Sequence, residues 1–156
     1  PLNFGVCPLH ISIIKEFEMS QSMKEFMKEM ESRRVYVKKT QQLKDLEADI
    51  RNEQPTGRGT LYAMNVNHAI TYDKRFIALA RPLMLEKLHE QGLELGKVYE
   101  QNPDTDVPMG SCEIINVFRK YKNSTKFEIS LQVKLNGVAV TQHYDCNTIF
   151  DRCIVK

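Results

Sequence analysis

Hydrophobic and polar residues alternate strictly in one stretch near the C-terminal end of the chain. The hydrophobic residues stand at every second position there: Phe127, Ile129, Leu131, Val133 and Leu135. The alternation resumes at Val138 and Val140, after an Asn136-Gly137 pair. Alternation with a period of two is typical of a half-buried β-strand, and Asn-Gly supplies the two positive φ angles of a type I′ turn. The pattern therefore predicts an antiparallel hairpin formed by Phe127–Leu135 and Val138–Tyr144.

A helical period appears in the first third of the chain. Ser22 stands three residues before Glu25, a capping-box pattern. It opens a stripe of large apolar residues at helical spacing: Met23, Phe26, Met27 and Met30. A second stretch, Thr40–Glu53, places Leu43, Leu46 and Ile50 on one face. We therefore predict two helices, each with one buried face. We interpret the methionine stripe as core; the alternative is a face that binds partners or drives oligomerisation.

The remaining segments are predicted to be mostly strands. Leu9–Phe17 is rich in β-branched residues, and Gly59–Val66 and Arg75–Leu85 are interpreted as two strands joined by a turn. Pro82–Gly92 stays open between strand and short helix, because proline suits a first helical position and glycine suits the residue after a helix end. Two further strand candidates are Leu93–Gln101 and Ser111–Phe118. The prediction is an α+β fold, mostly β, with helices in the first third.

The composition narrows the classes of function. The chain has 156 residues and a net charge of +2, values that fit one globular domain with a weak long-range field. No apolar run approaches the ~18 residues of a membrane span. Gly-rich phosphate loops, nucleophile elbows and zinc-deaminase signatures are missing from the sequence. We therefore expect a soluble, non-enzymatic module that uses no cofactor.

Two Cys/His pairs have the spacing of zinc ligands. Cys7 and His10 form one pair and His143 and Cys146 the other, each separated by two residues. Both pairs lie in segments that alternate like strands, where residues three apart point to opposite faces of a sheet. We therefore predict that the chain binds no zinc. The four cysteines are widely spaced, and we expect reduced thiols.

Residues 57–115 resemble a diverged Tudor domain. The family's opening strand, with the pattern Gly-x-Leu-Cys-Ala, is matched by Gly59–Ala63, and its second strand is matched loosely by Asp73–Ala78. Val98–Pro108 falls on the family's Asp-Tyr-Gly-Asn to Val-Pro stretch in the right order and distance. The resemblance implies a single extended Tudor domain over residues 1–156. Its Tudor-like barrel, residues 57–115, is inserted in or flanked by a nuclease-like (OB-type) barrel made of residues 1–54 and 116–156.

The chain departs from the Tudor family at the methylarginine cage. Gln101 stands where the family has a cage tyrosine, and Pro103 stands where it has an asparagine. The remaining candidate site residues are aromatic or acidic: Phe76, Tyr99, Glu100, Asp104 and Asp106. Carboxylates pair well with an unmodified guanidinium, whose N–H donors methylation blocks.

We therefore expect a peptide-binding adaptor that binds unmethylated arginine at least as tightly as dimethylated arginine. The family resemblance implies a Piwi-family Argonaute tail as the partner and cytoplasmic ribonucleoprotein granules as the location. The alternative for the acidic stretch is a solvated turn without a ligand.

A second hypothesis is that the chain binds single-stranded RNA on an OB-like surface. The stretch Phe118–Lys126 carries four positive charges and two aromatic residues. Its candidate contact residues are Arg119, Lys120, Tyr121 and Lys122. Basic side chains neutralise phosphates and aromatic rings stack on bases, which together are typical of single-strand binding. The alternative is that this basic hairpin is only a solubilising surface.

Overall fold

The computed structural model describes residues 21–32, 34–104 and 110–153, which fall into two compact units. Unit 1 (Pro1–Arg34) contains helix α2, Gln21–Ser32, at the position where the methionine stripe predicts a helix. The side chains of Met23, Phe26 and Met27 are 56%, 57% and 62% exposed, so the expected burial of this face is not found for these residues. The predicted strand Leu9–Phe17 lies outside the described residues.

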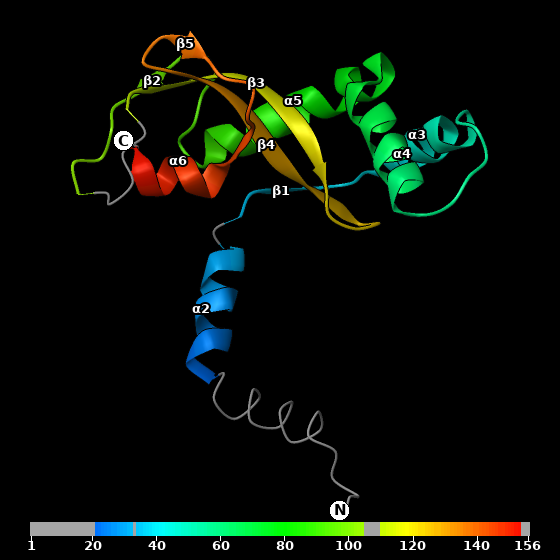
Figure 1. Cartoon of the computed structure of the whole chain (residues 1–156), viewed down its shortest axis with the longest axis horizontal. Coiled ribbons are helices and arrows are strands. Elements are labelled where there is room, and N and C mark those ends of the chain that lie inside the picture. The colour runs from blue at the N-terminus through cyan, green and yellow to red at the C-terminus, as the bar shows by residue number, and fades with distance from the viewer. Residues whose placement is uncertain (1–20, 33, 105–109, 154–156) are drawn as a thin grey trace, which may run out of the picture. The chain divides into compact units, whose positions relative to one another are not determined.

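Unit 2 (Val35–Lys156) combines helices with an antiparallel sheet of six strands in the part of the chain that the structure describes (Figure 1). The strands are β1 (Tyr36–Lys38), β2 (Val98–Tyr99), β3 (Cys112–Tyr121), β4 (Lys126–Leu135), β5 (Val138–Ala139) and β6 (Tyr144–Asp145). The helices are α3 (Gln41–Asn52), α4 (Thr60–Tyr72), α5 (Lys74–Glu90) and α6 (Cys146–Arg152). The predicted α+β class is confirmed, but the described residues are more helical than β, and helices also lie beyond the first third of the chain. The sheet is open and does not close into a barrel.

Strand β4 is the centre of the sheet. Strand β3 pairs with one edge of β4 over nearly its whole length, and β1, β6 and β5 pair in turn with the other edge. The short β2 pairs with the first residues of β3. The predicted hairpin is confirmed, because Leu135 pairs with Val138 across Asn136 (φ 51°) and Gly137 (φ 82°). After the turn the chain returns along β4 through β5 and β6. Four residues separate Ala139 of β5 from Tyr144 of β6, whereas only two separate their partners Lys134 and Leu131 on β4.

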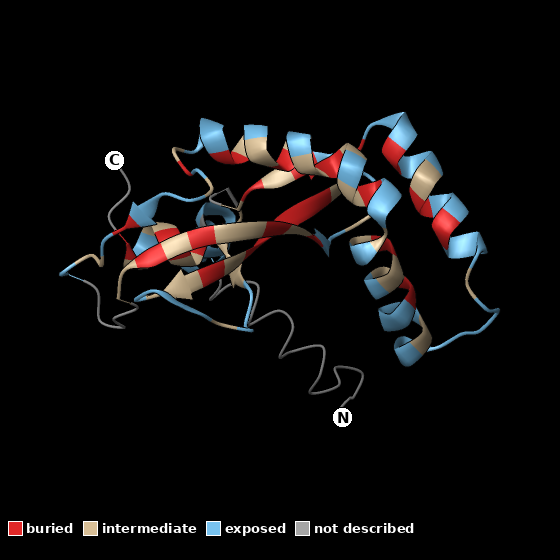
Figure 2. Ribbon diagram, turned by 90° about the horizontal axis from the view of Figure 1, so that it is seen from above, coloured by how far each residue is buried: buried red, intermediate tan, exposed pale blue. Residues whose placement is uncertain are grey.

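The two faces of the sheet have different surroundings. One face, which we call the helix face, packs against α3, α4 and α5, and Figure 2 shows the buried residues of these helices and strands in red. Its side chains on β4 are fully buried: Phe127, Ile129, Leu131 and Val133. The opposite face, which we call the outer face, carries side chains from three strands and the loop after β3: Tyr36, Lys38, Phe118, Lys120, Lys122 and Lys126.

The predicted strands Gly59–Val66 and Arg75–Leu85 are wrong, because both segments are helical. Helix α5 buries every fourth side chain against the sheet: Phe76, Ala80, Met84 and Leu88. Asp73 caps its start by accepting a hydrogen bond from the Arg75 backbone N–H at 2.9 Å. Pro82 lies in the interior of α5, not at its first position. The helix ends at Glu90, and Gly92 (φ 82°) follows its cap residue, as the helical alternative for this segment expected. The Leu93 N–H bonds to the Leu88 carbonyl in a Schellman motif.

The loop between α3 and α4, where the sequence predicts an internal boundary, lies within unit 2. Residues on both of its sides belong to one hydrophobic core, with Leu43 and Ile50 from α3 and Val66 and Ile70 from α4. Because these side chains pack together, residues 35–54 and the helices that follow share one folding unit.

Replacing Gly137 with alanine tests the type I′ turn. A Cβ atom at φ 82° is strained in an L-residue, so we expect Gly137→Ala to lower the free energy of unfolding by about 1–2 kcal/mol. Thr141→Ala, at an exposed position in the same returning segment, is the control and should change stability little. Urea denaturation followed by circular dichroism measures both. Equal stability of the two variants would contradict the turn.

Candidate nucleic-acid interface

The basic stretch Phe118–Lys126 forms the end of β3, a tight turn and the start of β4. Because side chains alternate along a strand, the four candidate RNA contacts are divided between the two faces of the sheet. Arg119 and Tyr121 point to the helix face, opposite Ile129 and Phe127, whereas Lys120 pairs with Glu128 on the outer face. The predicted contacts therefore belong to two different surfaces.

Arg119 belongs to a buried ionic cluster with Lys39 and Glu47. Lys39 Nζ donates to Glu47 Oε1 at 2.6 Å, and Arg119 Nε donates to Glu47 Oε2 at 3.0 Å. All three residues are buried: Lys39 is 5% exposed, and Glu47 and Arg119 are each 4% exposed. The cluster has two cations for one carboxylate. Because the Arg119 side chain is enclosed in this way, it does not offer its charge to a ligand at the surface.

Further contacts of the Arg119 guanidinium reach helix α4 and two aromatic rings. Nη2 donates to Asn67 Oδ1 at 3.3 Å, and Nη1 donates to the Asn67 carbonyl at 3.5 Å and to Thr71 Oγ1 at 3.4 Å. The guanidinium carbon lies 5.3 Å from the centre of the Tyr121 ring and 5.7 Å from that of Phe76. Burial lowers the pKa of Arg119, against the opposing effect of Glu47. Arg119 therefore fixes β3 to α3 and α4.

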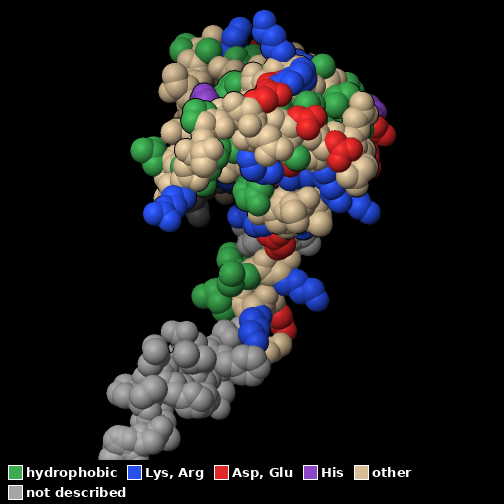
Figure 3. Space-filling model, turned by 90° about the vertical axis from the view of Figure 1, so that its right-hand side faces the viewer, with side chains coloured by type: hydrophobic (Ala, Val, Ile, Leu, Met, Phe, Trp, Pro, Cys, Tyr) green, Lys and Arg blue, Asp and Glu red, His purple; other side chains and the backbone are tan. Residues whose placement is uncertain are grey.

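The outer face joins lysines and aromatic rings at the same end of the sheet. Lys126 Nζ lies 4.0 Å from the centre of the Tyr36 ring, and Lys122 Nζ lies 6.0 Å from it. Lys38 and Lys122 are exposed. Figure 3 looks onto this end of the unit and shows Lys and Arg side chains gathered along its lower border. Ammonium groups beside a ring face can hold phosphates while the ring stacks on a base.

Two more features complete the outer face. The rings of Phe118 and His143 stack at 4.7 Å with an interplanar angle of 3°. Lys120 Nζ makes an ion pair with Asp145 Oδ1 at 3.1 Å, so part of its charge is compensated within the chain. Lys122 and Lys126 are therefore the stronger candidates for contacts with phosphates. Tyr36 was missed by sequence reasoning, because only strand pairing brings β1 beside the Phe118–Lys126 stretch.

The predicted arginine site is not assembled around its two aromatic candidates. Phe76 packs edge-on against Phe127 in the core and is 1% exposed. Tyr99 is 2% exposed and lies beside Cys112 at the far end of β3. Its hydroxyl accepts from the Glu94 N–H at 2.8 Å and donates to the Gly92 carbonyl at 3.2 Å. Both rings serve the core and present no face to a ligand.

The acidic stretch that follows Tyr99 uses its polar side chains to form a turn. Gln101 Oε1 accepts a hydrogen bond from the Gly110 N–H, and Asn102 Oδ1 accepts one from the Asp104 N–H, both at 3.0 Å. Glu100 and Asp104 are exposed. Asp106 lies outside the described residues. Turn formation accounts for Gln101 and Asn102, as the alternative of a solvated turn expects.

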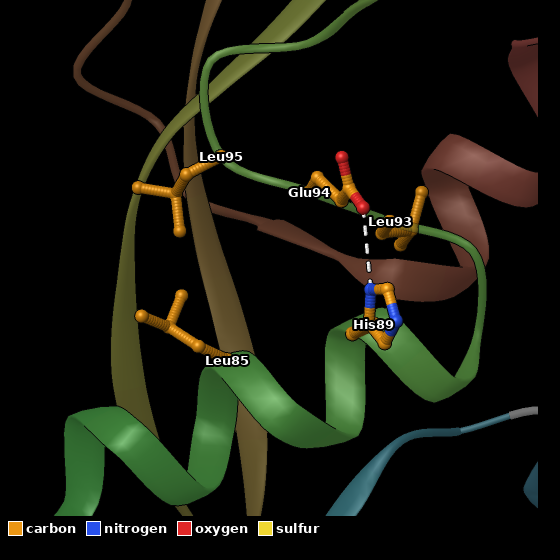
Figure 4. Close-up of a pocket in the computed structure, with 5 residues that line it drawn as sticks. All are labelled: Leu85, His89, Leu93, Glu94 and Leu95. Atoms are coloured by element: carbon orange, nitrogen blue, oxygen red, sulfur yellow. Dashed lines mark hydrogen bonds and ion pairs between the residues drawn. The ribbon is translucent and has the colours of Figure 1, made fainter.

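A separate apolar pocket of about 230 Å³ lies where α5 ends (Figure 4). Leu85 of α5 and Leu95 of the following segment point toward one another across it, and Leu93 closes one side. His89 Nδ1 and Glu94 Oε1 lie 3.2 Å apart at its rim, where both side chains are more than half exposed. The pocket can hold an apolar group. Sequence reasoning missed it because it depends on the chain reversing after Gly92.

The described cysteines are buried thiols. Cys112 and Cys153 lie in contact, and burial raises the pKa of Cys112 and that of Cys146 to about 12. His143 is exposed whereas Cys146 is buried, so this pair does not share a site. Among the described residues no three His, Cys, Asp or Glu side chains are grouped to hold a metal. Cys7 and His10 lie outside those residues.

Comparison of the chain with family models, curated proteins and solved structures finds no match. Within the described residues, no helix is long and apolar enough to cross a membrane. The candidate sites therefore rest on the geometry of this chain alone.

Removing the carboxylate charge of Glu47 tests the ionic cluster. Glu47→Gln leaves Lys39 and Arg119 buried without a counter-charge, so we expect the free energy of unfolding to fall by about 3 kcal/mol or more. Glu86→Gln makes the same change at an exposed position of α5 and should have little effect. Thermal and urea unfolding measure both variants, and similar midpoints would show that the cluster contributes little.

The raised thiol pKa values predict slow alkylation. At about pH 8 an ordinary thiol is partly ionised, but Cys112 and Cys146 stay protonated because burial disfavours the thiolate. We expect iodoacetamide to modify these two cysteines only after unfolding, as peptide mapping by mass spectrometry would show. The unfolded thiols ionise first as pH rises, so stability should also fall above about pH 8.5. Rapid alkylation of the folded chain would contradict their burial.

Proposed function

We propose that the chain is a non-catalytic module that binds single-stranded RNA on the outer face of its sheet. The observation that carries this proposal is the position of Lys122 and Lys126 over the ring of Tyr36. A phosphate is attracted to the ammonium groups, and a base stacks on the ring when a lysine moves toward the phosphate. Neither step requires a nucleophile, an acid–base pair or a metal.

The charge of the outer face supports this proposal. Lys38 lies opposite Lys126 in the register of β1 and β4, so lysines from two neighbouring strands stand side by side. A bound anion is attracted to both ammonium groups, while the carboxylate of Glu128, opposite Tyr36 on the same face, is buried. The stacked Phe118 and His143 rings extend the aromatic surface along β3 toward the middle of the sheet. A single strand running along this face meets both cations and rings.

Recognition of unmethylated arginine remains a second prediction from the sequence. With Phe76 and Tyr99 in the core, such a site would rest on carboxylates at the exposed Glu100 and Asp104, together with Asp106. Exposed pairs of this kind contribute at most about 1 kcal/mol each. The Tudor resemblance, the Piwi-family Argonaute partner, the granule location and the oligomerisation role of the Met23–Met30 face also remain predictions.

The RNA proposal is tested with paired lysine variants. We expect Lys122→Ala with Lys126→Ala to weaken binding of a fluorescent oligouridine by about tenfold, because two phosphate contacts are lost. Lys44→Ala with Lys97→Ala removes the same charge from exposed positions elsewhere in unit 2 and should change binding little. Fluorescence anisotropy at about 50 and about 200 mM salt measures both, and the salt slope should fall by about 0.7 for each lost contact.

Two controls make this test decisive. Tyr36→Leu keeps an apolar side chain but removes the ring face, so binding should weaken while the salt slope stays unchanged. An unmethylated arginine-rich peptide and its dimethylated form are measured beside the RNA. If the chain binds the unmethylated peptide and no RNA, and Glu100→Ala with Asp104→Ala abolishes that binding, the arginine hypothesis replaces the proposed function.

A further inference from the structure

A pocket of about 250 Å³ lies on the helix side of the β3–β4 hairpin. It is lined by residues of α3, α4 and the end of β3: Arg51, Tyr62, Ala63, Val66, Asn67 and Tyr121. Tyr121 comes directly before Lys122, so the pocket adjoins the surface to which we assign RNA binding. This pocket is not predictable from the residue pattern that we interpreted, because the segment that forms α4 was predicted to be a strand.

The surroundings of the pocket carry more positive than negative charge. Arg51 lines it directly, and the ionic cluster behind Asn67 and Tyr121 contains Lys39 and Arg119 for one Glu47. Arg51 and Arg119 are close enough for the charge of Arg51 to help lower the pKa of Arg119. An anion placed beside Arg51 reduces this repulsion, because it pairs with one cation and attracts the other. The pocket therefore favours a negatively charged ligand.

Asn67 has a fixed orientation between the ionic cluster and the pocket. Its Oδ1 accepts from Arg119 Nη2 at 3.3 Å, and a guanidinium can only donate hydrogen bonds. The amide oxygen therefore faces Arg119, which leaves the side-chain NH₂ group as the part of Asn67 available to a ligand in the pocket. An amide NH₂ in this position recognises an acceptor such as a carbonyl oxygen.

Two tyrosine rings provide the aromatic part of the pocket. Tyr121 is 47% exposed although the cations of Lys39 and Arg119 approach its ring at 5.4 and 5.3 Å. The Tyr62 ring lies tightly against Gly57, where an added Cβ would come within 2.5 Å of it. Tyr62 also lines a smaller pocket of about 160 Å³ beside the α3–α4 loop. Gly57 thus permits a ring position that a larger residue would change.

We propose that this pocket takes one nucleotide of the bound strand. The base stacks against Tyr62 or Tyr121, a base carbonyl accepts from the Asn67 NH₂ group, and the phosphate pairs with Arg51. The volume lies just below the range of about 300–1,000 Å³ that is usual for drug-sized ligands, which suits a single nucleotide. This inference rests on the proposed function, since it assigns the pocket to the same RNA strand.

The first test compares uridine monophosphate with its two parts. Ligand titrations followed by protein NMR measure the affinity for uridine monophosphate, uridine and inorganic phosphate. We expect the nucleotide to bind at least about tenfold more tightly than either part, because stacking, the amide contact and the charge act together. Phosphate binding as tightly as the nucleotide would overturn the inference and leave an anion site only. Absence of nucleotide binding would also overturn it.

The second test exchanges the Asn67 amide for a carboxylate. Asn67→Asp keeps an acceptor for Arg119, so the melting temperature should not fall, but it replaces the NH₂ donor with an oxygen that repels an anionic nucleotide. We expect nucleotide affinity to fall by about tenfold. Gln42→Glu makes the same charge change at an exposed position on α3 and should retain most of the affinity. Equal affinities for the two variants would overturn the role of Asn67.

The same variants separate this inference from the proposed function. In one outcome, Asn67→Asp and Gly57→Ala leave the binding of oligouridine and of the nucleotide unchanged, whereas Lys122→Ala with Lys126→Ala weakens oligouridine binding. The outer face then binds RNA and the pocket does not. If no variant on either face alters binding, both assignments are wrong. The inference is supported when Asn67→Asp weakens the nucleotide and the oligouridine together and the lysine pair weakens only the oligouridine.

Discussion

The carboxylate of Glu47 is the point at which four elements of unit 2 meet. It binds Lys39, which follows β1, and Arg119 of β3, while Arg119 in turn bonds to Asn67 and Thr71 of α4. Burying three charges costs desolvation free energy that the ion pairs only partly recover. We infer that the cluster adds specificity, since a different packing of α3 would leave buried charges without partners. The positions of Arg51, Asn67 and Tyr121 around the pocket that we propose for a nucleotide follow from this one arrangement.

A β-bulge decides which basic residue enters that cluster. The pairing of β3 with β4 shifts between Ile114 and Asn116, so that Ile114 and Val117 point to the same face although they are three residues apart. Without the extra residue, the alternation that buries Ile114 would turn Lys120 inward and Arg119 outward. The bulge thus buries the planar guanidinium, which can satisfy several acceptors at once, and leaves the lysines on the outer face.

How much of this could be predicted from the sequence depends on how local each signal is. The hairpin was predictable because alternation and the Asn136-Gly137 turn agree over neighbouring residues. Helices α4 and α5 were missed because apolar residues occupy several sides of both segments, and tertiary packing selected the helical period of Phe76, Ala80 and Met84. The resemblance in residues 57–115 relied on those segments as strands. Lys120 and Lys122 were found in one basic run, whereas Tyr36 and Asn67 enter the site only through contacts distant in sequence.

The turn between β3 and β4 links the outer face to the pocket and is held firmly. Asn123 Oδ1 accepts hydrogen bonds from the Thr125 N–H at 2.9 Å, the Thr125 hydroxyl at 2.8 Å and the Lys126 N–H at 3.0 Å. The Lys39 N–H bonds to the Thr125 carbonyl at 2.9 Å, which ties the turn to the residue that also reaches Glu47. A preordered turn loses little conformational entropy on binding. A single strand passing around this turn would meet Lys126 and Lys122 on one side and Tyr121 on the other, so the ionic cluster that positions these elements also sets the geometry of the proposed RNA contacts.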